Sequence, residues 1–111
     1  MTLDRILEYS TSKPDVEETF PFGPDVLVLK VEGKVFLLIP LDRFPLQFNA
    51  KCDPERAIDL REEYASIIPG YHMNKKHWNT IMLDGTVPSR LIYDLIDHSY
   101  VLVSGRGKKS R

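Results

Sequence analysis

The chain of 111 residues contains one cysteine, Cys52, so no intramolecular disulfide can form and nothing points to an oxidising compartment. It also lacks any apolar run near the roughly 20 residues that a membrane-spanning helix needs. The first residues do not show the basic and then apolar layout of a secretory signal. We therefore expect a cytoplasmic protein.

Positive charge is scarce outside the C-terminus. Of the 15 Lys and Arg residues, four lie in the last six positions, so 11 basic residues face all 16 acidic ones in the rest of the chain. Nonspecific nucleic-acid binding draws its free energy from releasing phosphate counterions. This body can therefore bind nucleic acid only through a local basic cluster or through the tail. We expect one domain at residues 1–104 and a disordered basic tail at 105–111.

Alternation and turn residues predict an antiparallel sheet. Residues 26–31 and 34–39 are rich in β-branched side chains and flank a Glu-Gly pair, which predicts a tight hairpin with Gly33 at positive φ. Residues 46–51 and 78–83 alternate apolar and polar side chains, so we expect two further strands, the first with one face in solvent.

Helical spacing of apolar residues marks the segments 2–10, 53–66 and 88–103. Thr2 caps the first segment, and Asp53 caps the second. The apolar stripe of the second segment consists of Ala57, Leu60, Tyr64 and Ile68.

Two stretches interrupt this pattern. Prolines within 17–25 predict a short edge strand or an extended arm, and 67–71 is compatible with one more strand. The order is α-β-β-β-β-α-β-α with short turns between successive strands. It predicts an α+β two-layer sandwich, an antiparallel β-sheet with helices packed on it.

The richest stretch chemically is Pro69-Gly70-Tyr71-His72-Met73-Asn74-Lys75-Lys76-His77-Trp78-Asn79, which we call the corner. One interpretation is structural. Gly70 allows the turn, Asn74 caps a short helical turn, and Tyr71 and Trp78 bury their rings. On this interpretation Trp78 is mostly buried in the core and is not a stacking platform.

A second interpretation is anion or nucleic-acid recognition. Lys75 and Lys76 follow the capping Asn74, which offers two ammonium groups and free backbone amides at the start of a turn. His72, His77 and Trp78 would add hydrogen bonds and a stacking face. Lys51 would join them from the solvent face of its strand.

Metal binding and catalysis are weaker interpretations. His72 and His77 are five residues apart, and only Cys52, Asp53 or Asp84 could complete a metal site. Either histidine is a conceivable acid–base group, with Tyr71 or Asp97 to orient it. Because no recognised nucleophile, phosphate loop or cofactor fingerprint is present, we expect no catalytic residues, no metal and no cofactor.

Taken together, the motifs resemble those of the MmcQ/YjbR family, over the chain up to about Val103. The matching residues are Glu18-Thr19-Phe20-Pro21-Phe22-Gly23-Pro24, residues 28–36 with Lys30, Gly33 and Lys34, Lys51-Cys52-Asp53-Pro54, Leu60-Arg61, the corner from Pro69 to Trp78, and Ser99-Tyr100. The resemblance implies a two-layer domain likened to secretion chaperones and to a "double wing" arrangement. It also implies DNA binding, and it brings no established catalytic residues.

We therefore expect a monomeric binding domain that contacts DNA or RNA through the corner. The alternative is a protein-interaction or chaperone-like adaptor that uses a sheet face, a sheet edge or the arm around Phe20 and Phe22. The third possibility is an enzyme that uses His72 or His77 as an acid–base group.

Overall fold

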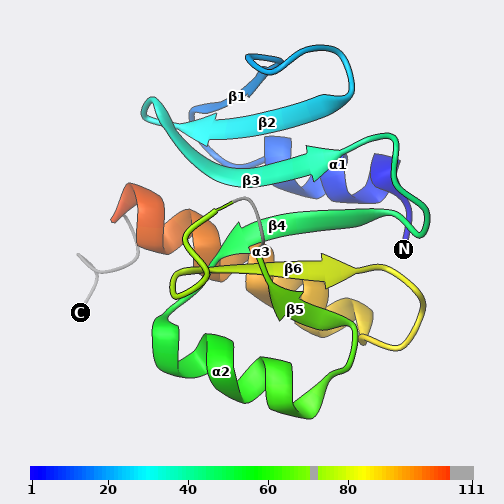
Figure 1. The fold of residues 1–111 in the computed structure, drawn as a ribbon. Coiled ribbons are helices and arrows are strands. Elements are labelled where there is room, and N and C mark those ends of the chain that lie inside the picture. The colour runs from blue at the N-terminus through cyan, green and yellow to red at the C-terminus, as the bar shows by residue number, and fades with distance from the viewer. Residues whose placement is uncertain (71–72, 106–111) are drawn as a thin grey trace.

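The computed structural model describes residues 1–70 and 73–105, which form a helix layer packed on a sheet (Figure 1). Over these residues there are three helices and six strands. In chain order they are α1 Leu3–Thr11, β1 Val16–Thr19, β2 Val26–Val31, β3 Lys34–Pro40, β4 Gln47–Lys51, α2 Pro54–Glu63, β5 Ile67–Pro69, β6 Trp78–Met82 and α3 Ser89–Ser104. The strands form one antiparallel sheet in the order β1-β2-β3-β4-β6-β5. The predicted α+β sandwich is confirmed.

Local signals account for most element boundaries. Thr2 Oγ1 accepts a hydrogen bond from the Arg5 N–H, and Asp53 accepts one from the Arg56 N–H, so both predicted caps are confirmed. Gly33 has φ +77° in the tight turn between β2 and β3, as predicted. The short edge strand predicted within 17–25 is confirmed in part, because β1 pairs with β2 at one end of the sheet but ends at Thr19, before the prolines.

The predicted extent of the second helix is wrong. α2 ends at Glu63, and Tyr64 is extended with φ −123° and ψ 118°. Ile68 does not continue the helical stripe, because it lies in β5 opposite Thr80 of β6. Tertiary pairing overrides local spacing here, since the edge of β6 offers the 67–69 backbone a ladder of hydrogen bonds.

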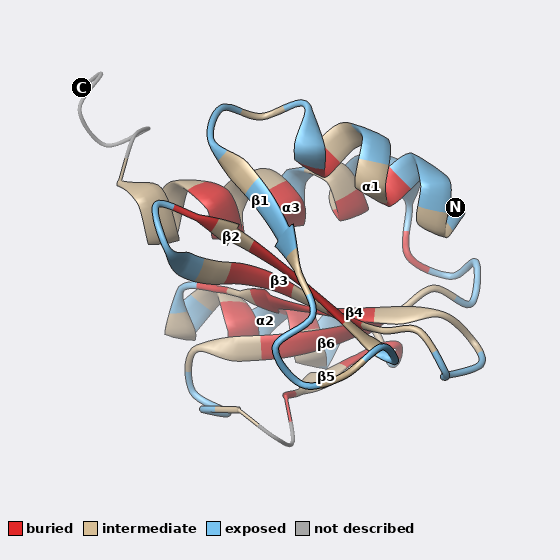
Figure 2. Ribbon diagram, turned by 90° about the horizontal axis from the view of Figure 1, so that it is seen from above, coloured by how far each residue is buried: buried red, intermediate tan, exposed pale blue. Residues whose placement is uncertain are grey.

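All three helices lie on one side of the sheet (Figure 2). α3 packs on β2, β3 and β4, α1 packs on β1 and α3, and α2 packs on β5. The hydrophobic core fills the space between the two layers and includes Phe36 and Tyr100, whose rings meet edge-on with centroids 5.4 Å apart. No helix of the described chain covers the opposite side of the sheet, which we call the open face.

A buried serine of α3 joins β3 to β4. The two strands pair at Leu37↔Ala50 and Leu38↔Asn49, and the next pair in this register would be Phe36 and Lys51. Instead, the Ser99 hydroxyl accepts from the Lys51 N–H at 2.9 Å and donates to the Phe36 carbonyl at 2.6 Å. One side chain therefore satisfies a donor and an acceptor that the parting strands would leave unpaired.

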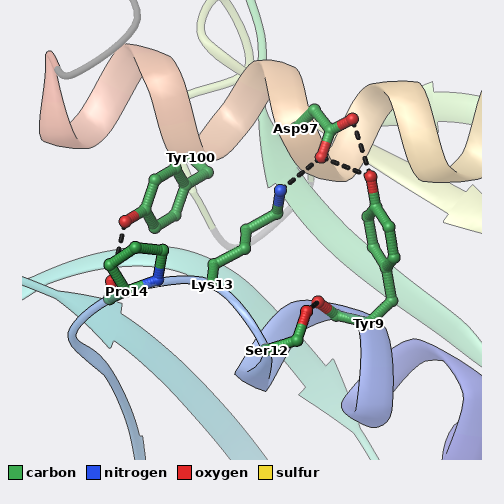
Figure 3. A network of polar contacts seen from close by, with 6 residues as sticks. All are labelled: Tyr9, Ser12, Lys13, Pro14, Asp97 and Tyr100. Carbon is green, nitrogen blue, oxygen red and sulfur yellow. Dashed lines mark hydrogen bonds and ion pairs between the residues drawn. The ribbon is translucent and has the colours of Figure 1, made fainter.

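The helix layer is fastened by a polar network between α1 and α3 (Figure 3). The Tyr9 hydroxyl donates to both Asp97 oxygens, at 2.7 and 2.8 Å, and Lys13 forms an ion pair with the same carboxylate. The Lys13 ammonium also lies 4.8 Å from the centre of the Tyr9 ring. Burial and the Asp97 carboxylate raise the pKa of Tyr9 to about 12, so this donor keeps its proton at neutral pH.

A second polar contact joins α2 to α3. His98 Nε2 accepts a hydrogen bond of 3.1 Å from the Asp53 N–H, and Arg56 forms an ion pair with Asp94 beside it. Burial and the Arg56 guanidinium lower the pKa of His98, although Asp53 and Asp94 oppose the shift. The neutral imidazole is therefore the form that the fold uses.

We expect Ser99→Ala to lower the free energy of unfolding by about 2 kcal/mol, because it leaves the Lys51 N–H and the Phe36 carbonyl without partners. Urea denaturation measures this change. Ser89→Ala is the control, since Ser89 is exposed at the start of the same helix. Equal stability of the two variants would contradict the bridging role.

We also expect stability to fall as pH drops below about 6.5, the ordinary pKa of histidine, because the unfolded chain then takes up a proton that folded His98 resists. The contribution is fully present above that pH. Urea denaturation at pH 7.5 and 5.5 measures it against His98→Gln, whose amide oxygen can accept the same bond without titrating. Identical pH dependence in both proteins would show that His98 does not carry the effect.

Candidate functional site

The corner connects β5 to β6, and its two ends are held by sheet hydrogen bonds. The Gly70 N–H donates to the Trp78 carbonyl at 3.0 Å, and the Met73 N–H donates to the Gly70 carbonyl at 3.2 Å. A Cβ on Gly70 would lie 3.2 Å from the Trp78 Cβ, so a larger residue here would have to displace Trp78 slightly. Tyr71 and His72, both candidate residues, lie outside the described part of the chain.

Asn74 organises the turn, as predicted. Its Oδ1 accepts from the Lys76 N–H at 2.9 Å, and its backbone carbonyl accepts from the His77 and Trp78 N–H groups at 3.1 and 2.9 Å. These three amides are therefore occupied. The expectation of free backbone amides for an anion is wrong at these positions, so an anion here has to be held by side-chain charge.

A cation from α2 joins the lysine pair. Arg61 Nη1 donates to the Lys75 carbonyl at 3.1 Å, and the Lys75 and Lys76 side chains are exposed. Neither Arg61 nor Lys76 forms an ion pair with another residue of the described chain. We call Arg61, Lys75 and Lys76 the corner cations. Arg61 and Lys75 are 14 positions apart in the sequence. No local signal in the sequence indicates this contact, which depends on the docking of α2 beside the corner.

His77 serves the backbone of the sheet. Its carbonyl accepts from the Cys52 N–H at 2.8 Å, which extends the pairing of β4 with β6, and its side chain is partly buried. The proposed orienting carboxylate Asp97 is occupied in the helix layer by Tyr9 and Lys13. Among the described residues Asp97 makes no hydrogen bond or ion pair with His77, and His72 lies outside the described chain.

The remaining candidate ligands have structural roles. Asp53 caps α2, while Asp84 holds Ser66 and Thr86, whose hydrogen bonds lower its pKa to about 2. Cys52 is buried, and burial raises the pKa of its thiol to about 11, which keeps it protonated and unreactive at neutral pH. Across residues 1–70 and 73–105, no group of three or more His, Cys, Asp or Glu side chains is placed to hold a metal ion.

Trp78 does not join the core. It is partly buried and lies outside the main cluster of buried side chains among the described residues, so the expectation of a core position is wrong. The reason is the register of β4 and β6, which sets Trp78 opposite Lys51 on the open face, away from the helices. The register thus places a tryptophan and a lysine opposite each other on this face.

The solvent face predicted for β4 is only partly correct. Asn49 is 8% exposed, because its Oδ1 accepts from the Thr80 hydroxyl of β6 and its Nδ2 donates to the Leu38 carbonyl at 3.4 Å. Around this pair lies a groove of about 510 Å³ on the open face. The residues that line it are Phe22, Val26, Leu38, Pro40, Asp42, Arg43, Gln47, Asn49, Ile68, Met73 and Thr80. Met73 connects this open-face groove to the corner.

None of the helices in the described parts of the chain is both long enough and apolar enough to cross a membrane. The candidate site consists of the corner cations, of which Lys75 and Lys76 are exposed and Arg61 is partly buried, and of the adjoining open-face groove. Both lie on the side of the sheet that the helices leave uncovered or at its β5–β6 edge. Of the candidate residues, Arg61 and Gln47 were not found from the sequence.

Comparisons with known proteins agree with this architecture. YbdF of Escherichia coli O157:H7 is 39% identical over 99 residues, which cover 88% of this chain and 81% of YbdF. YjbR of Escherichia coli K12 is 34% identical over 100 residues, covering 90% of this chain and 85% of YjbR. The crystal structure of DR2400 from Deinococcus radiodurans superimposes with a TM-score of 0.90 at 42% identity, over 96% of this chain and 80% of that one.

The family model YjbR matches residues 11–102, which span the strands, α2 and nearly all of α3. The resemblance to the MmcQ/YjbR family inferred from the motifs is thereby confirmed. The chain belongs to the YjbR family.

Proposed function

We propose that this YjbR-family domain is a non-catalytic binding domain that holds nucleic acid through the corner cations. The observation that carries the proposal is the hydrogen bond from Arg61 to the Lys75 carbonyl. It brings a third positive charge to the exposed lysine pair at a turn whose backbone is already fixed by Asn74. Phosphate oxygens are the natural ligands of such a cluster.

The charge of the rest of the chain restricts where a polyanion can bind. Acidic residues outnumber basic ones away from the tail, and α2 also exposes Asp59, Glu62 and Glu63. A phosphate backbone is therefore repelled over most of the surface and attracted at the corner. Binding of this kind is local and weakens steeply with salt.

A protein partner is the second candidate, and exposed aromatic rings favour it. Phe20, Phe22 and Phe44 are 50%, 70% and 101% exposed. Phe20 and Phe22 lie between β1 and β2, and Phe44 lies between β3 and β4. Burial of such rings against a partner would survive high salt, which separates this function from nucleic-acid binding.

We expect the double variant Lys75→Ala/Lys76→Ala to bind nucleic acid more weakly and with less salt dependence. The slope of log K against log salt should fall by about 1.8 on duplex DNA or about 1.4 on a single strand, the effect of losing two phosphate contacts. Fluorescence anisotropy with labelled oligonucleotides between 25 and about 200 mM salt measures the slope. The full chain is used throughout, so the basic tail is common to every protein compared.

The control for this experiment is Arg5→Ala/Arg90→Ala. It removes the same charge from exposed positions on α1 and at the start of α3. The control should leave the slope close to that of the parent. If the two double variants lose affinity equally, the corner is not the contact surface, and the protein-partner function replaces the proposal.

The Arg61 contact has its own test. Arg61→Gln should lower the slope of log K against log salt by the amount that one phosphate contact contributes, about 0.9 on duplex DNA. The reason is that it removes the cation that joins the lysine pair. Arg56→Gln is the matched control on the same helix, since Arg56 is already paired with Asp94. A larger loss in Arg56→Gln than in Arg61→Gln would exclude Arg61 from the site.

A further inference from the structure

The open-face groove has the size and composition of a ligand site. Its volume of about 510 Å³ falls within the range of roughly 300–1,000 Å³ that small-molecule sites occupy. Leu38, Ile68 and Met73 supply apolar surface to its lining, and Gln47, Asn49 and Thr80 supply polar groups. Such a site suits a flat ring that is apolar on its faces and polar at its edge.

The polar groups of the groove are not equally available. Asn49 and Thr80 bind each other, so their hydrogen-bonding capacity is partly used within the sheet. Gln47 is partly buried in the lining, and its side-chain amide makes no hydrogen bond to any described residue. An amide offers two donors and one acceptor, which match the mixed donors and acceptors at the edge of a nucleobase.

A stacking surface and a cation continue the groove toward the corner. Trp78 precedes Thr80 by two residues on the same face of β6, a distance of about 7 Å along the strand. Lys51 lies opposite Trp78 on β4. An aromatic ring beside a cation is the arrangement by which single-strand binders hold a base and its phosphate.

We infer that the open-face groove takes an unpaired nucleobase, so that the ligand of this domain is single-stranded nucleic acid. The inference rests on the proposed function, because Met73 links the groove to the corner cations that hold the phosphates. Gln47 contacts the edge of the base, and Trp78 stacks on a neighbouring base. A duplex keeps its bases paired and stacked, so it reaches the corner cations and leaves the groove empty.

The test compares three probes with the full chain: a ten-nucleotide DNA strand, an abasic strand with the same number of phosphates, and a ten-base-pair duplex. The single strand should bind at least about fivefold more tightly than the abasic strand, the lower end of what stacking of one base contributes. The emission of Trp78, the one tryptophan, should be quenched by the single strand and not by the abasic strand.

Gln47→Leu removes the amide and keeps the size of the side chain. It should reduce the preference for the single strand over the abasic strand and leave affinity for the abasic strand unchanged. Lys75→Ala/Lys76→Ala should lower the affinity for all three probes. Urea denaturation of Gln47→Leu confirms that the fold is intact.

The outcomes separate the two proposals. One outcome is that the single strand and the abasic strand bind with equal affinity and without quenching of Trp78, while Lys75→Ala/Lys76→Ala lowers the salt dependence. The groove inference is then overturned and the corner proposal stands. If the preference for bases persists while the lysine variant binds normally, the corner proposal fails and the groove remains the site. If no probe binds, or if an extended apolar peptide displaces the single strand from the groove at lower concentration, the inference is overturned.

Discussion

The hydroxyl of Ser99 is the contact around which the sheet is arranged. β3 and β4 pair over two residue pairs and then part, and Ser99 bonds the Lys51 N–H on one side and the Phe36 carbonyl on the other. Without this bridge the parting would leave two backbone groups unpaired beside the core. With it, β4 can continue pairing with β6 and lead directly into α2. The position of the corner next to α2, and hence the contact between Arg61 and Lys75, follows from that path.

The fold separates its polar groups by role. In the helix layer they are paired with one another: Tyr9 and Lys13 with Asp97, and Arg56 with Asp94. These contacts hold the helices together and leave little chemistry to offer a ligand. At the β5–β6 edge Lys76 forms no ion pair, and in the open-face groove the Gln47 amide makes no hydrogen bond, with any residue of the described chain. A ligand can therefore gain interactions on the open face without breaking any that the fold requires.

Membership of the YjbR family explains the fold of the molecule but does not identify its ligand. The ligand class has to be inferred from the surface. The surface favours a local electrostatic contact, because the chain outside its tail is acidic and the corner is basic. The occupied amides of the Asn74 turn also bear on how an anion could be held at the corner. They show that the turn supplies rigidity and that Arg61, Lys75 and Lys76 supply the charge. In the inferred complex, the unpaired Gln47 amide of the open-face groove adds the capacity to distinguish a base from a bare phosphate chain.

Signals that act over a few residues were sufficient to predict the helix caps at Thr2 and Asp53, the turn at Gly33 and the strands that flank it. They succeeded because a cap or a tight turn is decided by its own backbone and its nearest neighbours. Ile68, Trp78 and Arg61 were decided by the tertiary structure. An apolar residue after a helix can extend that helix or join a strand, and the free edge of β6 made Ile68 a strand residue. An aromatic residue on a two-faced strand is buried only if its face is covered, and the register turned Trp78 to the face without helices. Charges far apart in sequence form a site only when the fold brings them together, which is why the sequence alone revealed the lysine pair and only the packing of α2 added Arg61.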